Sequence, residues 1–207
     1  MLVDRTILAA RLDTGSLRIF SILAALFAGG ALLWGVLGLV HTLTADAVPV
    51  TQPVTVTMTD VATDGTASVL SGEATQADLS LAGLSLLARL LLGSGTLLVA
   101  LVQVMIAVAV VALCRQLQAG RPFVPAIRRL LTASALVALA GGLLGQALYG
   151  FGNFQVAVEL IEDPTGTAYP MMMLIDSTPI AVGAVLALIA TAFTVGERLQ
   201  RETDGLV

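Results

Sequence analysis

The sequence predicts an all-α membrane protein, in which four transmembrane helices form a bundle and the two outer loops form a small extracytoplasmic β-rich cap. Hydrophobic residues make up 57% of the 207 residues and charged residues only 12%, where a soluble domain carries roughly 25% charged residues. The mean hydropathy is +0.96. The apolar residues gather in four long runs, and arginines and acidic residues occupy different loops between these runs.

This composition argues against a water-soluble enzyme, a disordered chain and a coiled coil. All ten basic residues are arginines and the net charge is -4, so we expect no nucleic-acid partner. The chain has one cysteine and one histidine. A disulfide needs two thiols and a zinc site usually needs several such ligands, so we expect no metal and no cofactor.

Each apolar run is long enough to cross a hydrocarbon core of about 30 Å as a helix. We expect the spans at about residues 17–40, 96–117, 130–149 and 173–195. The second run extends from 79 to 118, and Gly93-Ser94-Gly95 is expected to divide it because glycine weakens a helix. Residues 79–92 then form an interfacial helix or an outer extension of the span. The chain is expected to be a single integral membrane domain with loops at residues 41–78, 118–129 and 150–172.

The arginines predict the orientation of the spans. All except Arg89 lie before the first span, between the second and third, or after the fourth, as Arg5, Arg11, Arg18, Arg115, Arg121, Arg128, Arg129, Arg198 and Arg201. Cytoplasmic loops carry the excess of arginine, so both termini are expected in the cytoplasm. The two outer loops are acidic, with Asp46, Asp60, Asp64, Glu73, Asp78, Glu159, Glu162 and Asp163.

A removable signal peptide is the alternative interpretation of the first apolar run. Ala45-Asp46-Ala47 fits the pattern of a cleavage site. The apolar run is longer than the 7–15 residues, roughly, of a signal core. We therefore expect the first span to remain in the protein.

Both outer loops carry the pattern of a β-hairpin. Residues 48–61 alternate, with Val54, Val56 and Met58 on one face, and Asp64-Gly65 predicts a turn before a return strand at 66–70. In the second loop the corresponding strand, turn and return strand are expected at residues 154–161, 163–166 and 167–172. Because isolated hairpins are marginal in water, we expect the two to pair into one sheet that caps the bundle.

Each half of the chain has the same order of cytoplasmic arginine, span, outer hairpin and span, and the halves end in the similar stretches 115–118 and 197–200. A duplication about an axis along the membrane normal would produce this order. Any four-span protein with two outer loops would show it as well, so both explanations stay open.

Polar residues in or beside the spans are costly and therefore informative. We expect an outer polar cluster, with Arg89 neutralising Asp176, made of His41, Arg89, Gln103, Gln146 and Asp176. The cluster is either a vestibule for a cation, proton or lipid headgroup, or a set of interhelical hydrogen bonds, and the second interpretation is preferred. The single histidine is expected to be an interfacial residue, and Cys114 a small buried hydrophobe.

Two further motifs concern packing and the inner loop. Gly141 and Gly145 form a GxxxG motif, which serves close helix packing within the chain or between two copies. The inner-loop motif consists of Gly120, Arg121, Pro122, Phe123, Arg128 and Arg129. Its glycine and proline are expected to end the second span, and its arginines to face anionic headgroups or a cytoplasmic partner. Pro125 is placed early in the next helix, where a missing N–H costs nothing.

The inner loop and the C-terminus carry a family resemblance. Residues 117–123 (LQAGRPF), together with 127–130 and the ending 193–207, resemble domain-of-unknown-function family 2975, whose members are small four-span bacterial membrane proteins. The resemblance covers the C-terminal half and does not include the loop at 41–78. It implies a protein of the bacterial inner membrane, often encoded near a small helix-turn-helix regulator, and it brings no activity, cofactor or catalytic residue.

The sequence as a whole favours a non-enzymatic sensory, accessory or structural protein of the inner membrane, with an acidic outer cap and an arginine-rich inner loop. A small transporter or channel that uses the outer polar cluster is the alternative. The expected partners are the lipid bilayer and either a second copy of the chain or another membrane protein. An enzyme acting on lipid would need an acid/base pair that the sequence does not offer.

Overall fold

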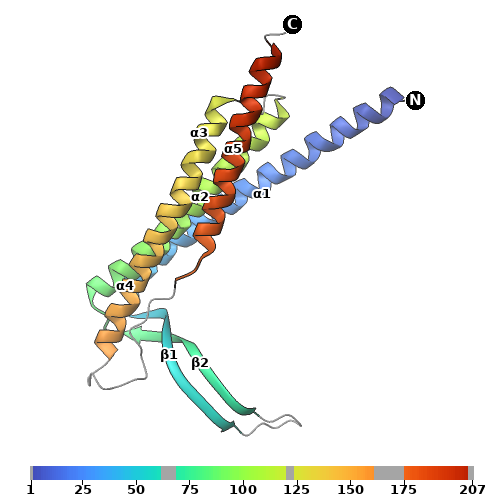
Figure 1. Cartoon of the computed structure of the whole chain (residues 1–207). Coiled ribbons are helices and arrows are strands. Elements are labelled where there is room, and N and C mark those ends of the chain that lie inside the picture. Colours follow the sequence, from blue (N-terminus) through green and yellow to red (C-terminus); the bar gives the residue numbers. More distant parts are fainter. Residues whose placement is uncertain (1, 62–68, 120–123, 161–174, 205–207) are drawn as a thin grey trace. The chain divides into compact units, whose positions relative to one another are not determined.

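The computed structural model of this chain describes residues 2–61, 69–119, 124–160 and 175–204. Helices dominate, and the two strands follow the first helix directly (Figure 1). The elements in chain order are α1 (Leu2–Thr44), β1 (Ala47–Val61), β2 (Val69–Ala82), α2 (Leu86–Gln118), α3 (Pro125–Leu136), the π-helix η1 (Val137–Gly141), α4 (Gly142–Leu160) and α5 (Thr178–Asp204).

Four helical runs in the described part of the chain are long and apolar enough to cross a membrane. They are Gly15–Thr44, Leu86–Gln118, Pro125–Leu160 and Thr178–Arg198. The third run joins α3, η1 and α4 without a break. The expectation of four apolar helices and a small sheet is therefore confirmed.

The chain divides into two compact units, which are described separately. The first unit consists of Met1–Gly35, Leu98–Leu144 and Ser177–Val207, and the second of Val36–Leu97 and Gly145–Asp176. Helices α1, α2 and α4 contribute residues to both units.

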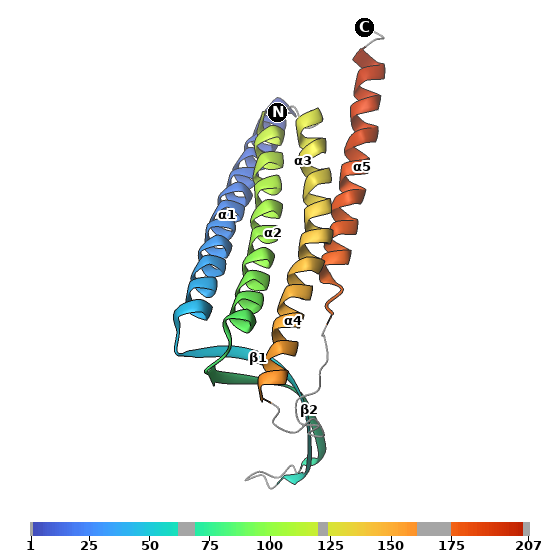
Figure 2. The ribbon, with the colours of Figure 1, turned by 90° about the vertical axis from the view of Figure 1, so that its left-hand side faces the viewer.

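In the first unit, α3 and α5 lie side by side (Figure 2). The buried core of this packing joins Ala109 of α2, Ile127 and Leu131 of α3, and Ala190 of α5. Small residues bring the helices close together, because a Cβ added at Gly183 would lie 3.2 Å from Leu139 Cβ. Close packing of small and apolar residues therefore holds α3 against α5, in addition to the ion pair between Arg128 and Glu197.

The π-helix η1 lies between α3 and α4, where the third apolar run passes the start of α5. A Cβ added at Gly142, the first residue of α4, would lie 2.6 Å from Pro179 Cβ. The extra residue of a π turn shifts the helical register. In this chain the shift coincides with a close approach to Pro179.

In the second unit, β1 and β2 form an antiparallel hairpin, the one sheet in the described residues. Pro53 pairs with Gln76 and Val56 with Ala74, so β1 gains one residue over β2 in a β-bulge. Bulges suit proline, because it cannot donate to the ladder. The bulge separates the base of the hairpin from its distal part.

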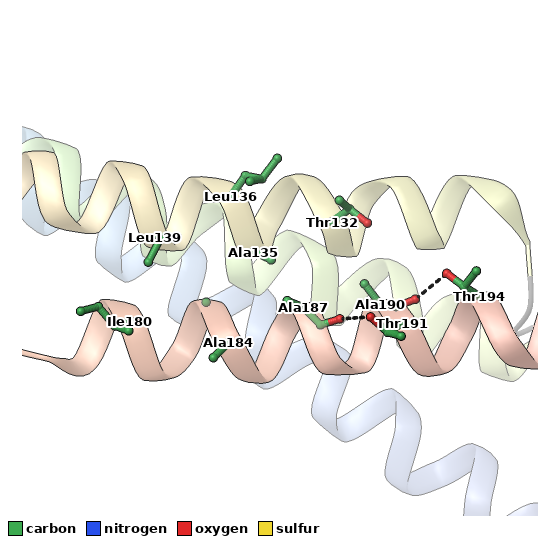
Figure 3. Close-up of a pocket in the computed structure, with 11 residues that line it drawn as sticks. Thr132, Ala135, Leu136, Leu139, Ile180, Ala184, Ala187, Ala190, Thr191 and Thr194 are labelled. Carbon is green, nitrogen blue, oxygen red and sulfur yellow. Dashed lines mark hydrogen bonds between the residues drawn. The ribbon is translucent and has the colours of Figure 1, made fainter.

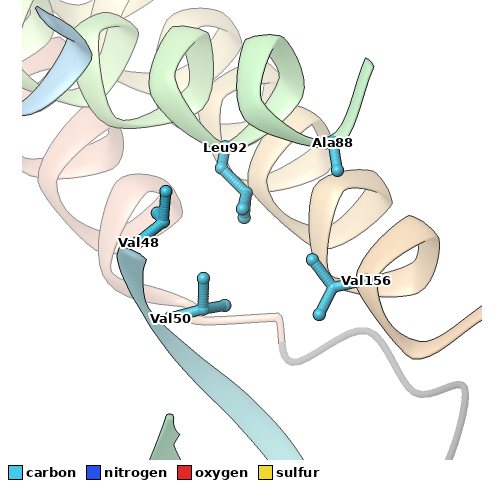
Figure 4. Close-up of a cluster of buried hydrophobic side chains, with 5 residues drawn as sticks. All are labelled: Val48, Val50, Ala88, Leu92 and Val156. Carbon is cyan, nitrogen blue, oxygen red and sulfur yellow. The ribbon is translucent and has the colours of Figure 1, made fainter. Parts of the chain in front are cut away.

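The base of the hairpin packs on helix ends of the same unit. Val48 and Val50 of β1 are buried against Ala88 and Leu92 of α2 and Val156 of α4 (Figure 4). The alternation predicted for β1 holds from Val48 to Gln52, where Val48, Val50 and Gln52 are buried and Thr51 is exposed, and it is interrupted at the bulge, where Pro53 and Val54 are both buried. The hairpin is therefore anchored in an apolar core of its own unit.

The expected break in the second span is wrong, because α2 runs from Leu86 through Gly93-Ser94-Gly95 without interruption. The glycines serve close packing instead. A Cβ added at Gly93 would lie 2.6 Å from Leu39 Cδ1, and one at Gly95 would lie 2.7 Å from the backbone nitrogen of Tyr149. Residues 79–82, expected in a helix, belong to β2.

The strand expected at residues 154–161 is also wrong, because α4 continues to Leu160. Its buried side chains are Asn153, Val156 and Ala157, with Leu160 packed against the same core. This is helical spacing, and it competes with the period-two pattern in the same short stretch. The turn and return strand expected at 163–172 lie outside the described residues. The sheet in the described residues consequently comes from the first loop alone.

Two further boundaries differ from the prediction. The return strand of the hairpin, expected at 66–70, is β2 (Val69–Ala82), and the expected turn at Asp64-Gly65 lies outside the described residues. Helix α5 begins at Thr178 rather than near 173, with proline at its second position. Proline suits the first turn of a helix and disfavours helical geometry before it.

Candidate functional site

The polar groups of the second unit concentrate where the hairpin meets the helix ends. We call this region the hairpin junction and define it by Gln52, Ser85, Arg89, Asn153 and Glu159. Three sets of hydrogen bonds, described next, connect these side chains to the backbone of α1, β1, α2 and α4.

Arg89, in the first turn of α2, donates to three backbone carbonyl groups. Its Nε lies 3.2 Å from the oxygen of Leu84, and its Nη1 lies 3.3 Å from that of Thr42 and 2.7 Å from that of Ala45. The last carbonyls of a helix have no intrahelical partner and carry its negative dipole end, which favours a cation there. Arg89 thus ties the end of α1 and the approach to β1 to the start of α2.

The expected ion pair between Arg89 and Asp176 is not found in the described part of the chain. The guanidinium instead satisfies the carbonyls of Leu84, Thr42 and Ala45. The physical reason is local, because the end of α1 leaves carbonyl groups that need donors and Arg89 is the cation within reach.

Ser85 caps the N-terminus of α2. Its Oγ accepts from the backbone N–H of Ala88 at 3.2 Å. The carboxylate of Glu159 accepts from the backbone N–H of Ser85 at 3.0 Å and also from its hydroxyl, and it accepts from Gln155 Nε2 at 3.1 Å. A serine cap with a carboxylate at a helix N-terminus matches the helix dipole, and here the carboxylate comes from α4.

Gln52 and Asn153 form a reciprocal pair between β1 and α4. Gln52 Nε2 donates to the backbone oxygen of Asn153 at 3.1 Å, and Asn153 Nδ2 donates to the backbone oxygen of Thr51 at 3.2 Å. Gln52 is 1% and Asn153 is 7% exposed. Among the described residues, their amide oxygens Oε1 and Oδ1 have no partner. The pair fixes which residue of β1 faces α4.

The remaining members of the expected outer polar cluster occupy different places. His41 is exposed in the last turn of α1. Gln146 accepts from the backbone N–H of Asp176 at 2.9 Å and donates to its backbone oxygen at 3.0 Å. Gln103 belongs to the first unit, and because α2 begins at Leu86 it lies near the middle of that helix. Asp176 precedes α5 rather than lying within it.

The inner-loop motif is described only in part, because Gly120, Arg121, Pro122 and Phe123 lie outside the described residues. Pro125 is the first residue of α3, as expected. Arg128 Nη1 lies 3.6 Å from Glu197 Oε2 of α5. Arg129 is exposed.

The two glycines of the GxxxG motif take part in packing within the chain. Gly141 lies in η1, and a Cβ added there would meet Val102 Cγ2 of α2 at 2.8 Å. The backbone oxygen of Gly145 lies 2.8 Å from the Cβ position of Gly95. Each glycine therefore faces α2 within its own unit.

Sequence reasoning missed Gln52, Asn153 and the cap by Glu159. One signal was available for Gln52, because the alternation of β1 puts it on the same face as Val48 and Val50. A polar residue on an apolar face needs a partner when buried. The cap by Glu159 has no such signal, because Ser85 and Glu159 are far apart in sequence.

The chemistry that this region supports is binding and positioning. No group of three or more histidine, cysteine, aspartate or glutamate side chains among the described residues could hold a metal ion. Cys114 is buried in the first unit. The donors of Arg89 and the carboxylate of Glu159 are directed at protein backbone and at Ser85.

No family model, curated protein or solved structure matches this chain.

Proposed function

We propose that this chain is a non-enzymatic, multi-pass protein of the bacterial inner membrane that acts as a sensory, accessory or structural component. In this proposal the hairpin is the part that meets an extracytoplasmic partner, and the four helices anchor and orient it. Both termini are proposed to lie in the cytoplasm, on the basis of the arginine distribution. The resemblance to family 2975 agrees with this location and stays a prediction.

The observation that carries the proposal is the contact of Arg89 with both ends of the α1–β1 connection. Its Nη1 donates to Thr42 in the last turn of α1 and to Ala45 just before β1. The reciprocal pair of Gln52 and Asn153 holds the base of the hairpin against α4. A partner that binds and displaces the hairpin would therefore also displace the ends of α1, α2 and α4, because hydrogen bonds rather than a free linker join them to the hairpin.

The charge of the hairpin supports a role in recognition. Its described exposed side chains include Asp46, Glu73 and Asp78, while no lysine or arginine lies within β1 or β2. Thr51 donates to Asp78 across the strands at 2.7 Å, which orders one of these carboxylates. A partner with basic groups would match this surface.

Photo-crosslinking from the hairpin in intact cells tests this role. A photoreactive residue at exposed Thr75 should give a protein adduct of one defined mass, and the same residue at exposed Ile189 on α5 should not. Adducts that are identical at the two positions, or that are absent at Thr75, would contradict a role of the hairpin in recognition.

A small transporter or channel is the alternative function. It requires polar groups that are free to bind a solute, whereas Arg89 and Gln146 bond the protein backbone. Proteoliposomes should show no flux of protons or monovalent cations above protein-free vesicles. A flux that disappears in Gln103→Leu or Gln146→Leu would favour the transporter instead.

A further inference from the structure

A groove of about 600 Å³ runs between α3 and α5 in the first unit (Figure 3). Along α5 its lining residues follow one stripe, from Ile180 through Gly183 and Ala187 to Thr194. At about 1.5 Å per residue this stripe is about 21 Å long. Half of a hydrocarbon core is about 15 Å, so the groove is long enough for a chain that fills one leaflet.

The lining of the groove offers hydrocarbon rather than hydrogen-bonding groups. Its threonine hydroxyls donate to carbonyl groups of their own helices. Thr191 donates to Ala187 at 2.9 Å and Thr194 to Ala190 at 3.0 Å (Figure 3), and Thr132 donates to Arg128 at 3.0 Å. Because each hydroxyl already donates within its own helix, the methyl group is the part of each threonine that contacts a ligand in the groove. The ligand that suits such a lining is an aliphatic chain.

One end of the groove is charged. Thr132 and Thr194 mark this end, and one turn beyond them Arg128 and Glu197 form an ion pair at 3.6 Å. Arg128 keeps 38% of its side chain exposed, and neighbouring Arg129 is exposed. Two arginines against one carboxylate leave a positive excess, which suits a phosphate.

From the apolar lining, the length and the charged end, we propose that this groove binds one acyl chain of an anionic phospholipid, whose phosphate meets Arg128 and Arg129. The acyl chain lies along Ala187 toward Ile180. Under the proposed orientation of the helices, the lipid comes from the cytoplasmic leaflet. The site is independent of the hairpin junction and of any role of the hairpin.

Native mass spectrometry of the full chain, released from bilayers of equal phosphatidylglycerol and phosphatidylcholine, tests the proposal. The wild type should retain phosphatidylglycerol over phosphatidylcholine. Arg129→Gln should reduce this preference about five-fold, which corresponds to about 1 kcal/mol per arginine at a membrane surface. Arg115→Gln, which removes another exposed arginine of the same unit, should leave the preference unchanged.

Filling the groove tests the acyl chain separately from the phosphate. Ala187→Leu should reduce the retained lipid, whatever its headgroup. Ala192→Leu is the matched control, because Ala192 is also exposed on α5 and does not line the groove. Ala184→Leu is a second groove variant, and circular dichroism checks that each variant keeps its helices.

Three results would overturn the proposal. The wild type could retain both lipids equally, or Ala187→Leu and Ala192→Leu could retain the same amount of lipid. The wild type could also be a dimer that Ala187→Leu dissociates without a change in lipid retention, which would identify the occupant as a second copy of the chain.

Discussion

Within each of the two units, a different kind of contact holds the elements together. In the second unit, the side chains of Arg89, Gln52 and Asn153 bond backbone groups of neighbouring elements. In the first unit, α2, α3 and α5 pack through small and apolar residues such as Ala109 and Ala190, and one ion pair, Arg128–Glu197, joins α3 to α5. The hydrogen bonds of the second unit fix the direction and register of the hairpin, whereas the packing of the first unit requires only that the helix surfaces fit each other.

The difference follows from what each unit must position. A strand register that slips by one residue turns every side chain to the other face, so a hairpin base needs directional contacts. Helices in lipid already satisfy their backbone internally and need only close packing. We therefore expect the second unit to be sensitive to loss of polar groups and the first to changes of volume.

The largest expected effect is that of Arg89→Ala. Because hydrogen bonds to charged groups contribute about 1.5–3 kcal/mol each, losing the bonds to Thr42 and Ala45 should lower the free energy of unfolding by about 3 kcal/mol. The measurement is SDS titration in mixed micelles. Arg115→Ala, which removes an exposed arginine, should change the value by less than about 0.5 kcal/mol. Equal effects of the two substitutions would remove the distinction between the units.

Glycine substitutions sharpen the comparison. A Cβ at Gly142, in the first unit, would lie 2.6 Å and 2.9 Å from Cβ and Cγ of Pro179, whose ring is rigid. Gly142→Ala should therefore destabilise the protein by about 1–3 kcal/mol. Gly30 has no atom within 4 Å of its Cβ position, so Gly30→Ala should be neutral or stabilising by up to about 1 kcal/mol. Destabilisation by Gly30→Ala in the same assay would contradict the packing of α1.

The reciprocal amide pair predicts a smaller, coupled effect. Asn153→Ala removes the bond to Thr51 and should cost about 1–2 kcal/mol in the free energy of unfolding. Combined with Gln52→Ala, the two costs should not add, and the coupling energy should exceed about 0.5 kcal/mol. Full additivity in this double-mutant cycle would show that the two side chains act independently.

The smallest expected effect is that of His41→Ala. His41 was grouped with the polar cluster from its sequence position, but its side chain is exposed at the end of α1. We expect a change of less than about 0.5 kcal/mol in the same titration. A decrease in the free energy of unfolding comparable to that of Arg89→Ala would show that His41 takes part in the polar contacts of the outer cluster.

The four apolar helices and the first strand were predictable because their signals are long and regular. Runs of this length have one solution in lipid, and the alternation of β1 has one face to bury. The extension of α4 to Leu160 was not predictable from the pattern alone. Residues 154–160 satisfy both a strand and a helix period, and the choice depends on packing against Val48 and Val50.

The residues of the hairpin junction were also only partly predictable from the sequence. Arg89 was identified because a cation near a span needs a partner, but the partner was assigned to a side chain, Asp176, when it is backbone. Backbone acceptors exist at every helix end and leave no trace in the sequence. Gly93 and Gly95 were identified as a helix break, although glycine equally serves close packing, which only the neighbours Leu39 and Tyr149 reveal.

Hydrogen exchange of the backbone amides of the non-proline residues within 47–54, at the base of β1, tests the central claim most directly. If Arg89 and the amide pair fix the hairpin base to the helix ends, these amides exchange slowly in the full-length protein in lipid nanodiscs. They should exchange markedly faster in Arg89→Ala and remain slow in Arg115→Ala. Fast exchange in the wild type, or the same slow exchange in Arg89→Ala, would contradict the account.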